Sequence, residues 1–167
     1  MAAKKKAATG IADSAMRRSS SRAFERREEP PQFYPVNRAA MDNEVEKLAK
    51  LLDSGANIEQ PDNVDGATPL INACRYDAPE AALALILRGA NIDATCQGGD
   101  TAIGWAAVNN MTGVGRVLIE KGCNMNVELN GRDSIEEYAR DYSDNNPEFY
   151  AMMLDAIENR DRRLADE

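Results

Sequence analysis

The chain has 167 residues, enough for one domain with a hydrophobic core but hardly for two. It is 43% hydrophobic and 29% charged, as soluble proteins are, and no apolar run approaches the ~18 residues of a membrane helix. The sequence contains no histidine, which excludes Ser–His and Cys–His catalytic pairs and most zinc sites. We therefore expect no enzymatic activity, cofactor, metal site, small-molecule substrate or membrane insertion.

Positive charge is concentrated at the N-terminus. Residues 1–40 carry nine basic and four acidic side chains, a net charge of +5, so the other 127 residues hold −13 of the total of −8. Residues 1–33 contain few large apolar side chains, too few to offset the entropy lost on ordering. We predict a basic arm over 1–33 that is disordered when free.

The function of this arm is open to several interpretations. One interpretation is that residues 1–30 bind an acidic or polyanionic surface, such as a nucleic acid backbone. The alternatives are a nuclear localisation signal and a solvated tail without a partner. Ala, Lys, Arg and Ser dominate residues 1–27, which is also compatible with an organellar transit peptide. An Arg-Arg-Ser-Ser sequence is typical of basophilic kinase substrates, so Ser19 and Ser20 are candidate phosphorylation sites.

Short motifs recur along the rest of the chain in step with one another. A glycine followed by a small residue, Asn and an apolar residue returns at spacings of 34 and 33, at residues 55–58, 89–92 and 122–125. A second glycine motif returns at spacings of 33 and 32, at residues 66–70, 99–103 and 131–135. A pair of small residues recurs in step with both glycine motifs, at 39–40, 73–74 and 106–107.

These motifs resemble the ankyrin repeat, a β-turn and two antiparallel helices over about 33 residues with a T-P-L-H-x-A pattern. The resemblance implies an all-α solenoid of four units, at about 34–65, 66–98, 99–130 and 131–160, followed by a charged tail at 161–167. The histidine position departs from the family, so the hydrogen bond that it usually supplies is missing or replaced; this position holds Asn37, Ile71, Gly104 and Glu136.

The residues themselves agree with helical units. Thr68 can cap a first helix that has Pro69 at its first position, where a missing N–H costs nothing. Gly55, Gly89 and Gly122 would end the second helices as left-handed caps. Large apolar side chains are expected to cover the core from the second helices, namely Leu48, Leu51, Leu52, Leu83, Ile86, Leu87, Val117, Leu118 and Ile119.

Two glycines weaken the second helix of the third unit. Gly113 and Gly115 each cost ~1 kcal/mol relative to Ala in a helix interior. Either this end of the helix frays, or a neighbouring backbone approaches closely there.

The cysteines indicate a reducing compartment, because their number is odd and they form no C-x-x-C pair. Cys74 and Cys123 fall at small-residue positions and are expected in the core. Cys96 falls in a loop between units, so we expect it to be the thiol that reacts rapidly. We expect a cytoplasmic protein, with a cytoskeletal or other large assembly as its setting, or an organellar one if the arm is a transit peptide.

The resemblance also implies a binding surface, because ankyrin partners usually contact the hairpin tips and the concave face made by the first helices. The matching tip positions are Val64, Asp65, Gln97, Asp100 and Arg132, and the matching helix positions are Arg75, Tyr76, Val108, Asn109 and Arg140. Tyr76, Val108 and Arg75 form the expected apolar and cationic centre, although plain exposure would also explain such residues. Trp105 is expected in the core, with a binding anchor as the alternative.

A protein–protein interaction module, either a free adaptor or a subunit of a larger complex, is therefore the first functional hypothesis. Arm-mediated binding to nucleic acid or another polyanion is the second, and the −13 charge of the rest of the chain opposes it. An enzyme that uses carboxylates alone is the weakest hypothesis.

Overall fold

The computed structural model describes residues 33–125, 128–129, 133–134 and 147–165. Within these residues the regular secondary structure is almost all helix, as predicted, and loops connect the helices. The helices are α1 (Pro35–Met41), α2 (Val45–Asp53), α3 (Pro69–Arg75), α4 (Pro79–Leu87), α5 (Ala102–Val108), α6 (Thr112–Glu120) and α8 (Pro147–Ala165). The strands β1 (Glu128–Leu129) and β2 (Asp133–Ser134) form one short antiparallel pair.

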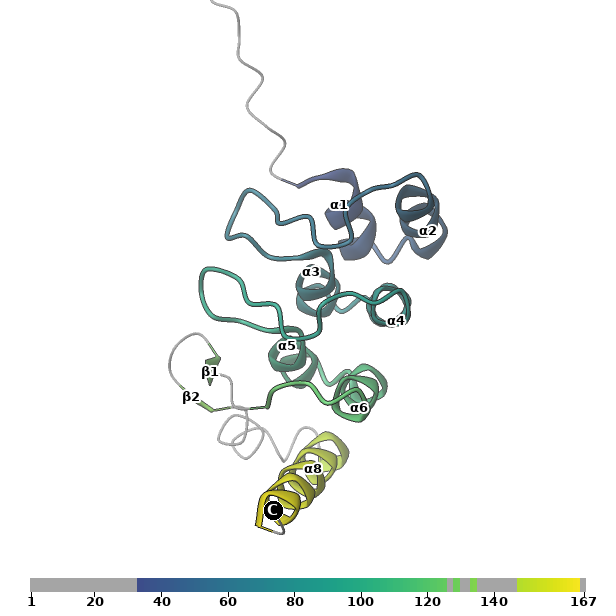
Figure 1. Ribbon diagram of the computed structural model, residues 1–167. Helices are drawn as coiled ribbons and strands as arrows, with labels where there is room; N and C mark the ends of the chain where they lie inside the picture. The colour runs from purple at the N-terminus through teal and green to yellow at the C-terminus, as the bar shows by residue number, and fades with distance from the viewer. Residues whose placement is uncertain (1–32, 126–127, 130–132, 135–146, 166–167) are drawn as a thin grey trace, which may run out of the picture. The chain divides into compact units, whose positions relative to one another are not determined.

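The first six helices form two rows (Figure 1). Helices α1, α3 and α5 make the first row, and α2, α4 and α6 make the second, with neighbours in each row packed together. The long connections that precede α3 and α5 project beside the first row. No helix within the described residues is both long and apolar enough to cross a membrane.

The first helices of the second and third units begin at threonine caps. Thr68 Oγ1 accepts a hydrogen bond from the Ile71 amide at 3.4 Å, as predicted for this unit. Thr101 Oγ1 accepts one from the Gly104 amide at 3.3 Å in the next unit. These bonds satisfy amides that have no partner within the helix, which fixes where α3 and α5 start.

Left-handed residues end the helices. The predicted caps Gly55, Gly89 and Gly122 have φ values of 94°, 86° and 80°, a region where a side chain would be strained. The turns between the two helices of a unit also use this region, at Asn43, Asp77 and Asn110, each with a φ of 55°. Asn and Asp tolerate it better than other side chains do, so the residue type matches the backbone.

Carboxylates tie the first unit to the second and the second to the third. Glu59 Oε1 accepts a hydrogen bond from the Asn91 amide at 2.7 Å, one unit further along. Asp93, the equivalent residue of that unit, accepts one from the Asn124 amide, also at 2.7 Å. The repeated bond holds successive loops at a constant spacing.

The core lies between the two rows and consists mostly of small residues on the first helices and of alanine and larger aliphatic residues on the second. One prediction about it is wrong: Leu87 is 77% exposed, whereas Leu85 is completely buried. Helix α4 is apolar on nearly all sides, so its own sequence does not mark the buried face. The residues one unit before and after Leu87 are Asp53 and Glu120, which is consistent with a solvent-facing position.

The two glycines of α6 have different environments. Gly113 is exposed, and a Cβ there would meet nothing within 4 Å. Gly115 is buried, and a Cβ there would collide with the ring of Phe149 in α8. Phe149 and Met153 are themselves buried, so α8 closes the core over α6. The close approach therefore comes from a side chain rather than from the backbone considered above.

Candidate protein-binding surface

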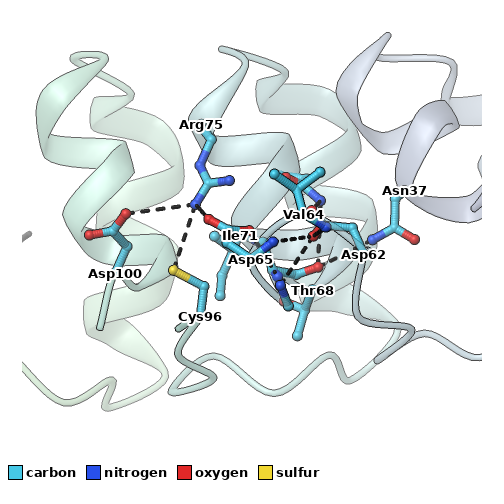
Figure 2. Close-up of polar contacts among 12 residues, drawn as sticks. Asn37, Asp62, Val64, Asp65, Thr68, Ile71, Arg75, Cys96 and Asp100 are labelled. Carbon is cyan, nitrogen blue, oxygen red and sulfur yellow. Dashed lines mark hydrogen bonds and ion pairs between the residues drawn. The ribbon is translucent and has the colours of Figure 1, made fainter. Parts of the chain in front are cut away.

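The tip of the loop before α3 is organised by a buried carboxylate. Asp62 Oδ1 accepts hydrogen bonds from the amides of Val64, Asp65 and Gly66, at 3.0, 3.1 and 3.2 Å (Figure 2). Its second oxygen accepts one from Asn72 Nδ2 at 2.8 Å, which anchors the tip to α3. The predicted binding residues Val64 and Asp65 therefore lie on a rigid turn.

A second amide joins this loop to the first unit. Asn37 Nδ2 donates to the carbonyl oxygens of Gln60, at 2.9 Å, and of Ala67, at 3.3 Å. Asn37 occupies the histidine position of the repeat pattern, so in the first unit the expected hydrogen bond is replaced. In the second unit the same position holds Ile71, which is fully buried.

Arg75 joins the loops of two units. Its Nη2 donates to Asp65 Oδ2 at 2.7 Å, lies 3.6 Å from Asp100 Oδ2 and donates to Cys96 Sγ at 3.7 Å (Figure 2). The guanidinium also lies over the ring of Trp105, 5.2 Å from its centroid. The Arg75 side chain is only 17% exposed, so most of the predicted cationic centre is engaged inside the protein.

Asp65 and Arg75 each stabilise the charged form of the other. Partial burial alone would raise the pKa of Asp65, but the hydrogen bond and the charge of Arg75 lower it below its ordinary value. Burial likewise acts to lower the pKa of Arg75, and the bond and charge of Asp65 outweigh it and raise that pKa. Both groups therefore stay ionised, and the ion pair persists at neutral pH.

One of the three cysteines is less accessible than expected. Cys96 is only 7% exposed despite its place in a loop, because its side chain faces Arg75, so the prediction of a readily accessible thiol is wrong. Cys74 and Cys123 are buried, as predicted. Burial raises the pKa of Cys74 to about 12, and burial together with the charge of Asp93 raises that of Cys123 to about 12.

Hydrogen bonds to backbone carbonyl oxygens connect two further residues that were predicted to bind a partner. The Gln97 amide donates to the Asp65 carbonyl oxygen at 2.8 Å, so the two tips touch. Asn109 Nδ2 donates to the carbonyl oxygens of Cys74, at 2.7 Å, and Arg75, at 3.1 Å. Asn109 thus caps the end of α3 from the neighbouring unit.

The side chains left exposed at this junction are largely apolar. Tyr76 and Val64 are each 50% exposed, and Val108 is 36% exposed. Trp105 is half-buried and packs against the core, as predicted, and its Nε1 is buried without a hydrogen-bond partner among the described residues. We define the α3–α5 face as Val64, Tyr76, Asp77, Gln97 and Val108, all exposed.

Other predicted sites fall elsewhere. Arg132, Arg140, Ser19 and Ser20 lie outside the described residues. Within the described part of the chain, no three His, Cys, Asp or Glu residues are placed to hold a metal ion. As protein-binding positions, the ten residues expected from the repeat pattern stay predictions.

The turn closed by Asp62 has a local signal in the sequence, although it was not predicted. Asp62 begins an Asp-Asn-Val-Asp-Gly run, which is typical of a turn closed by an Asp side chain. The bond from Asp62 to Asn72 and the convergence on Arg75 depend on the tertiary fold and carry no local signal.

The comparison with known families agrees with this geometry. A model of ankyrin repeats matches residues 36–128 in three copies, more than half of the chain. No curated protein shows a significant match. The fourth unit, at 131–160, lies beyond the matched residues and stays a prediction. The paired helices, the glycine caps and the family match together show that this chain belongs to the ankyrin-repeat family.

Proposed function

We propose that this chain is a non-enzymatic adaptor or assembly subunit that binds a partner protein through the α3–α5 face and the neighbouring tips. Ankyrin repeats are generally protein–protein interaction modules. The observation that carries the proposal is the exposure of Tyr76 and Val108 on adjacent units, since tyrosine is enriched among residues that dominate binding energy.

The rigidity of the surroundings supports this proposal. Tyr76 follows Arg75, whose guanidinium is held by Asp65 and Asp100, and Val108 precedes Asn109, whose amide holds the end of α3. A partner would therefore meet side chains whose backbone is already fixed. Such preorganisation strengthens binding, because less entropy is lost on association.

A matched set of variants tests the proposal. The double variant Tyr76→Ala with Val108→Ala should lose captured partners in a crosslinking pull-down while its thermal midpoint stays unchanged. Leu87→Ala is the control, because it removes an exposed apolar side chain from the second row of helices. Equal partner capture by the double variant and the control would show that binding does not use this face.

The basic arm supports a second candidate function, contact with nucleic acid or another polyanionic surface. The charge split between +5 in residues 1–40 and −13 elsewhere favours an arm that acts separately from the repeats. Duplex binding that weakens steeply with salt and disappears on deletion of residues 1–30 would support it. Binding that survives the deletion would contradict it.

We also propose a reducing, cytoplasmic setting, because the three cysteines are free and buried. Fluorescence microscopy of the tagged full chain tests this location. An organellar signal would support the interpretation of residues 1–27 as a transit peptide.

A further inference from the structure

A cavity of about 620 Å³ lies between α6 and α8. Volumes between about 300 and 1,000 Å³ are typical of small-molecule sites in proteins. The apolar part of its lining comes from α6, the loop that follows α6, and α8, as Ile119, Cys123, Met125, Met152 and Ala156. None of these residues belongs to the α3–α5 face, so the proposed function gives this cavity no role.

The cavity lies where the regular repeat ends. Helices α2, α4 and α6 have nine residues each, and a left-handed glycine follows each of them and turns the chain. The amides of Asn91 and Asn124, just after two of these turns, then bond to carboxylates of the preceding unit. Helix α8 contains no glycine and continues for 19 residues. A straight helix thus passes the loop of the third unit, whereas earlier units set loop against loop.

The apolar lining is incompletely covered. Ile86 on α4 is 2% exposed, whereas Ile119, its equivalent on α6, is only partly buried and lines the cavity. Met125 and Met152 are also partly buried there. Covering such surface with an apolar ligand is favourable, because it removes the surface from water. Methionine side chains are flexible and polarisable, so they adapt to the shape of a ligand.

The charged groups at the cavity do not favour an ionic ligand. Arg116, Glu120 and Asp155 line it with exposed side chains of both signs. Arg116 Nη2 already lies 3.6 Å from Glu148 Oε1. Burial is the largest cause that raises the pKa of Cys123 to about 12, so this thiol is neutral and adds apolar surface. An ion would lose water against this lining without a buried counter-charge, which is costly.

One residue of the lining offers an uncharged polar side chain. Asn159 on α8 is partly buried, and its Oδ1 accepts a hydrogen bond from Arg162 Nη1 at 3.2 Å. This bond uses the oxygen of the amide. Its Nδ2, which bonds to no described residue, can donate to an oxygen of a ligand.

We propose that the cavity between α6 and α8 binds an uncharged small molecule with an apolar body and one hydrogen-bond acceptor. The apolar body contacts Ile119, Met125 and Met152, and the acceptor takes a hydrogen bond from Asn159. The inference goes beyond the proposed function, because it uses no residue of the α3–α5 face. The expectation of no small-molecule substrate is unaffected, since the ligand is bound without reaction.

The test uses the full chain with carbon-13 in its methionine methyl groups, and acetonaphthone as the uncharged probe. In an NMR titration the signals of Met125 and Met152 should shift and saturate, whereas that of Met41, buried on α1, should stay in place. Naphthoate and naphthylmethylammonium carry opposite charges on the same rings, and each should bind at least ~10-fold more weakly. Absence of saturable shifts, or equal affinity for the three probes, would overturn the inference.

Two alanines of α8 provide a matched pair of variants. Ala156→Trp fills the cavity and should weaken acetonaphthone binding at least ~10-fold. Ala151→Trp adds the same rings at an exposed position of the same helix, and this variant should bind the probe like the wild type. Equal affinity in the two variants would show that the probe does not occupy this cavity.

Asn159→Leu tests the hydrogen bond, and it keeps the inference falsifiable if Ala156→Trp disturbs the packing of α8. This variant should weaken acetonaphthone by ~3–10-fold, because the ligand oxygen loses its donor. Ethylnaphthalene has no oxygen, so its affinity should not fall. Equal weakening of the two probes would show that Asn159 does not recognise an acceptor and would overturn the proposed ligand chemistry.

Discussion

Arg75 lies over the ring of Trp105, with its guanidinium carbon 5.2 Å from the ring centroid, so the end of α3 covers a residue of α5. Trp105 is the only tryptophan of the chain, and its fluorescence therefore reports on this junction between units. The same guanidinium holds Asp65 and Asp100. One side chain of α3 therefore joins the ring of the next unit to carboxylates on two loops.

Loss of Arg75 should weaken the fold. Arg75→Ala would leave Asp65 and the nearly buried Asp100 without this cation, and we expect a loss of ~1–3 kcal/mol in the free energy of unfolding. Urea unfolding followed by circular dichroism measures it. Arg38→Ala is the control, because the Arg38–Asp42 pair is exposed and should contribute less than ~1 kcal/mol. Similar losses for the two variants would mean that the Arg75 network is not structural.

Acid should weaken the same network. The pKa of Asp65 lies below its ordinary value of 3.8 in the folded state, so its ionised form stabilises the fold above that pH. This contribution is lost as the pH falls through the lower folded value. Between about pH 7 and about pH 3, Asp65→Asn should lose less stability than the wild type in urea unfolding. Parallel losses in the two proteins would contradict the assignment.

The thiols should be protected in the folded protein. All three cysteines are buried. The thiols of Cys74 and Cys123 have pKa values of about 12, so they form little thiolate at neutral pH. Labelling with a chromogenic disulfide should be slow in buffer and should accelerate as urea is added. Mass spectrometry locates the label, and prompt modification of Cys96 in buffer would mean that its loop is open.

The two glycines of α6 should respond differently to the same change. Gly115→Ala places a methyl group against Phe149 and should destabilise the protein by ~1–3 kcal/mol. Gly113→Ala meets open space in a helix and should be neutral or stabilising by up to ~1 kcal/mol. Thermal unfolding of the pair measures the difference. Equal effects would indicate that α8 does not pack on α6 in solution.

The register of α4 can be tested with two leucines. Leu85→Ala removes a fully buried side chain and should cost ~2–5 kcal/mol, whereas Leu87→Ala removes a mostly exposed one and should cost less than ~0.5 kcal/mol. Urea unfolding of the two variants measures both values. The reverse order would mean that α4 is rotated from its described orientation.

The parts of this fold that the sequence predicts well are those fixed by local backbone chemistry. Gly89 ends a helix in the left-handed region, and Thr68 with Pro69 starts one, because few other residues satisfy those conformations. Repetition along the chain makes such signals easy to recognise.

The wrong predictions concern side chains whose burial the local sequence does not determine. Leu85 and Leu87 are equally apolar, and only comparison with the equivalent residues of α2 and α6 separates them. Cys96 could face either solvent or a neighbouring unit from its loop, and its contact with Arg75 depends on a helix 21 residues away. The network around Arg75 likewise joins three separate segments, so its geometry follows from tertiary packing.

The ring of Phe149 packs against α6 at Gly115, where a side chain would collide with it. The residues one and two units earlier than Gly115 are Ala82 and Leu48, and either would put atoms where the ring lies. Helix α8 therefore recognises the third unit and no other. Deleting the third unit, or exchanging it for another, would put a side chain where the Phe149 ring lies, so α8 should not pack on the stack in the same way. The absence of a side chain at Gly115 thus determines which unit α8 can pack against.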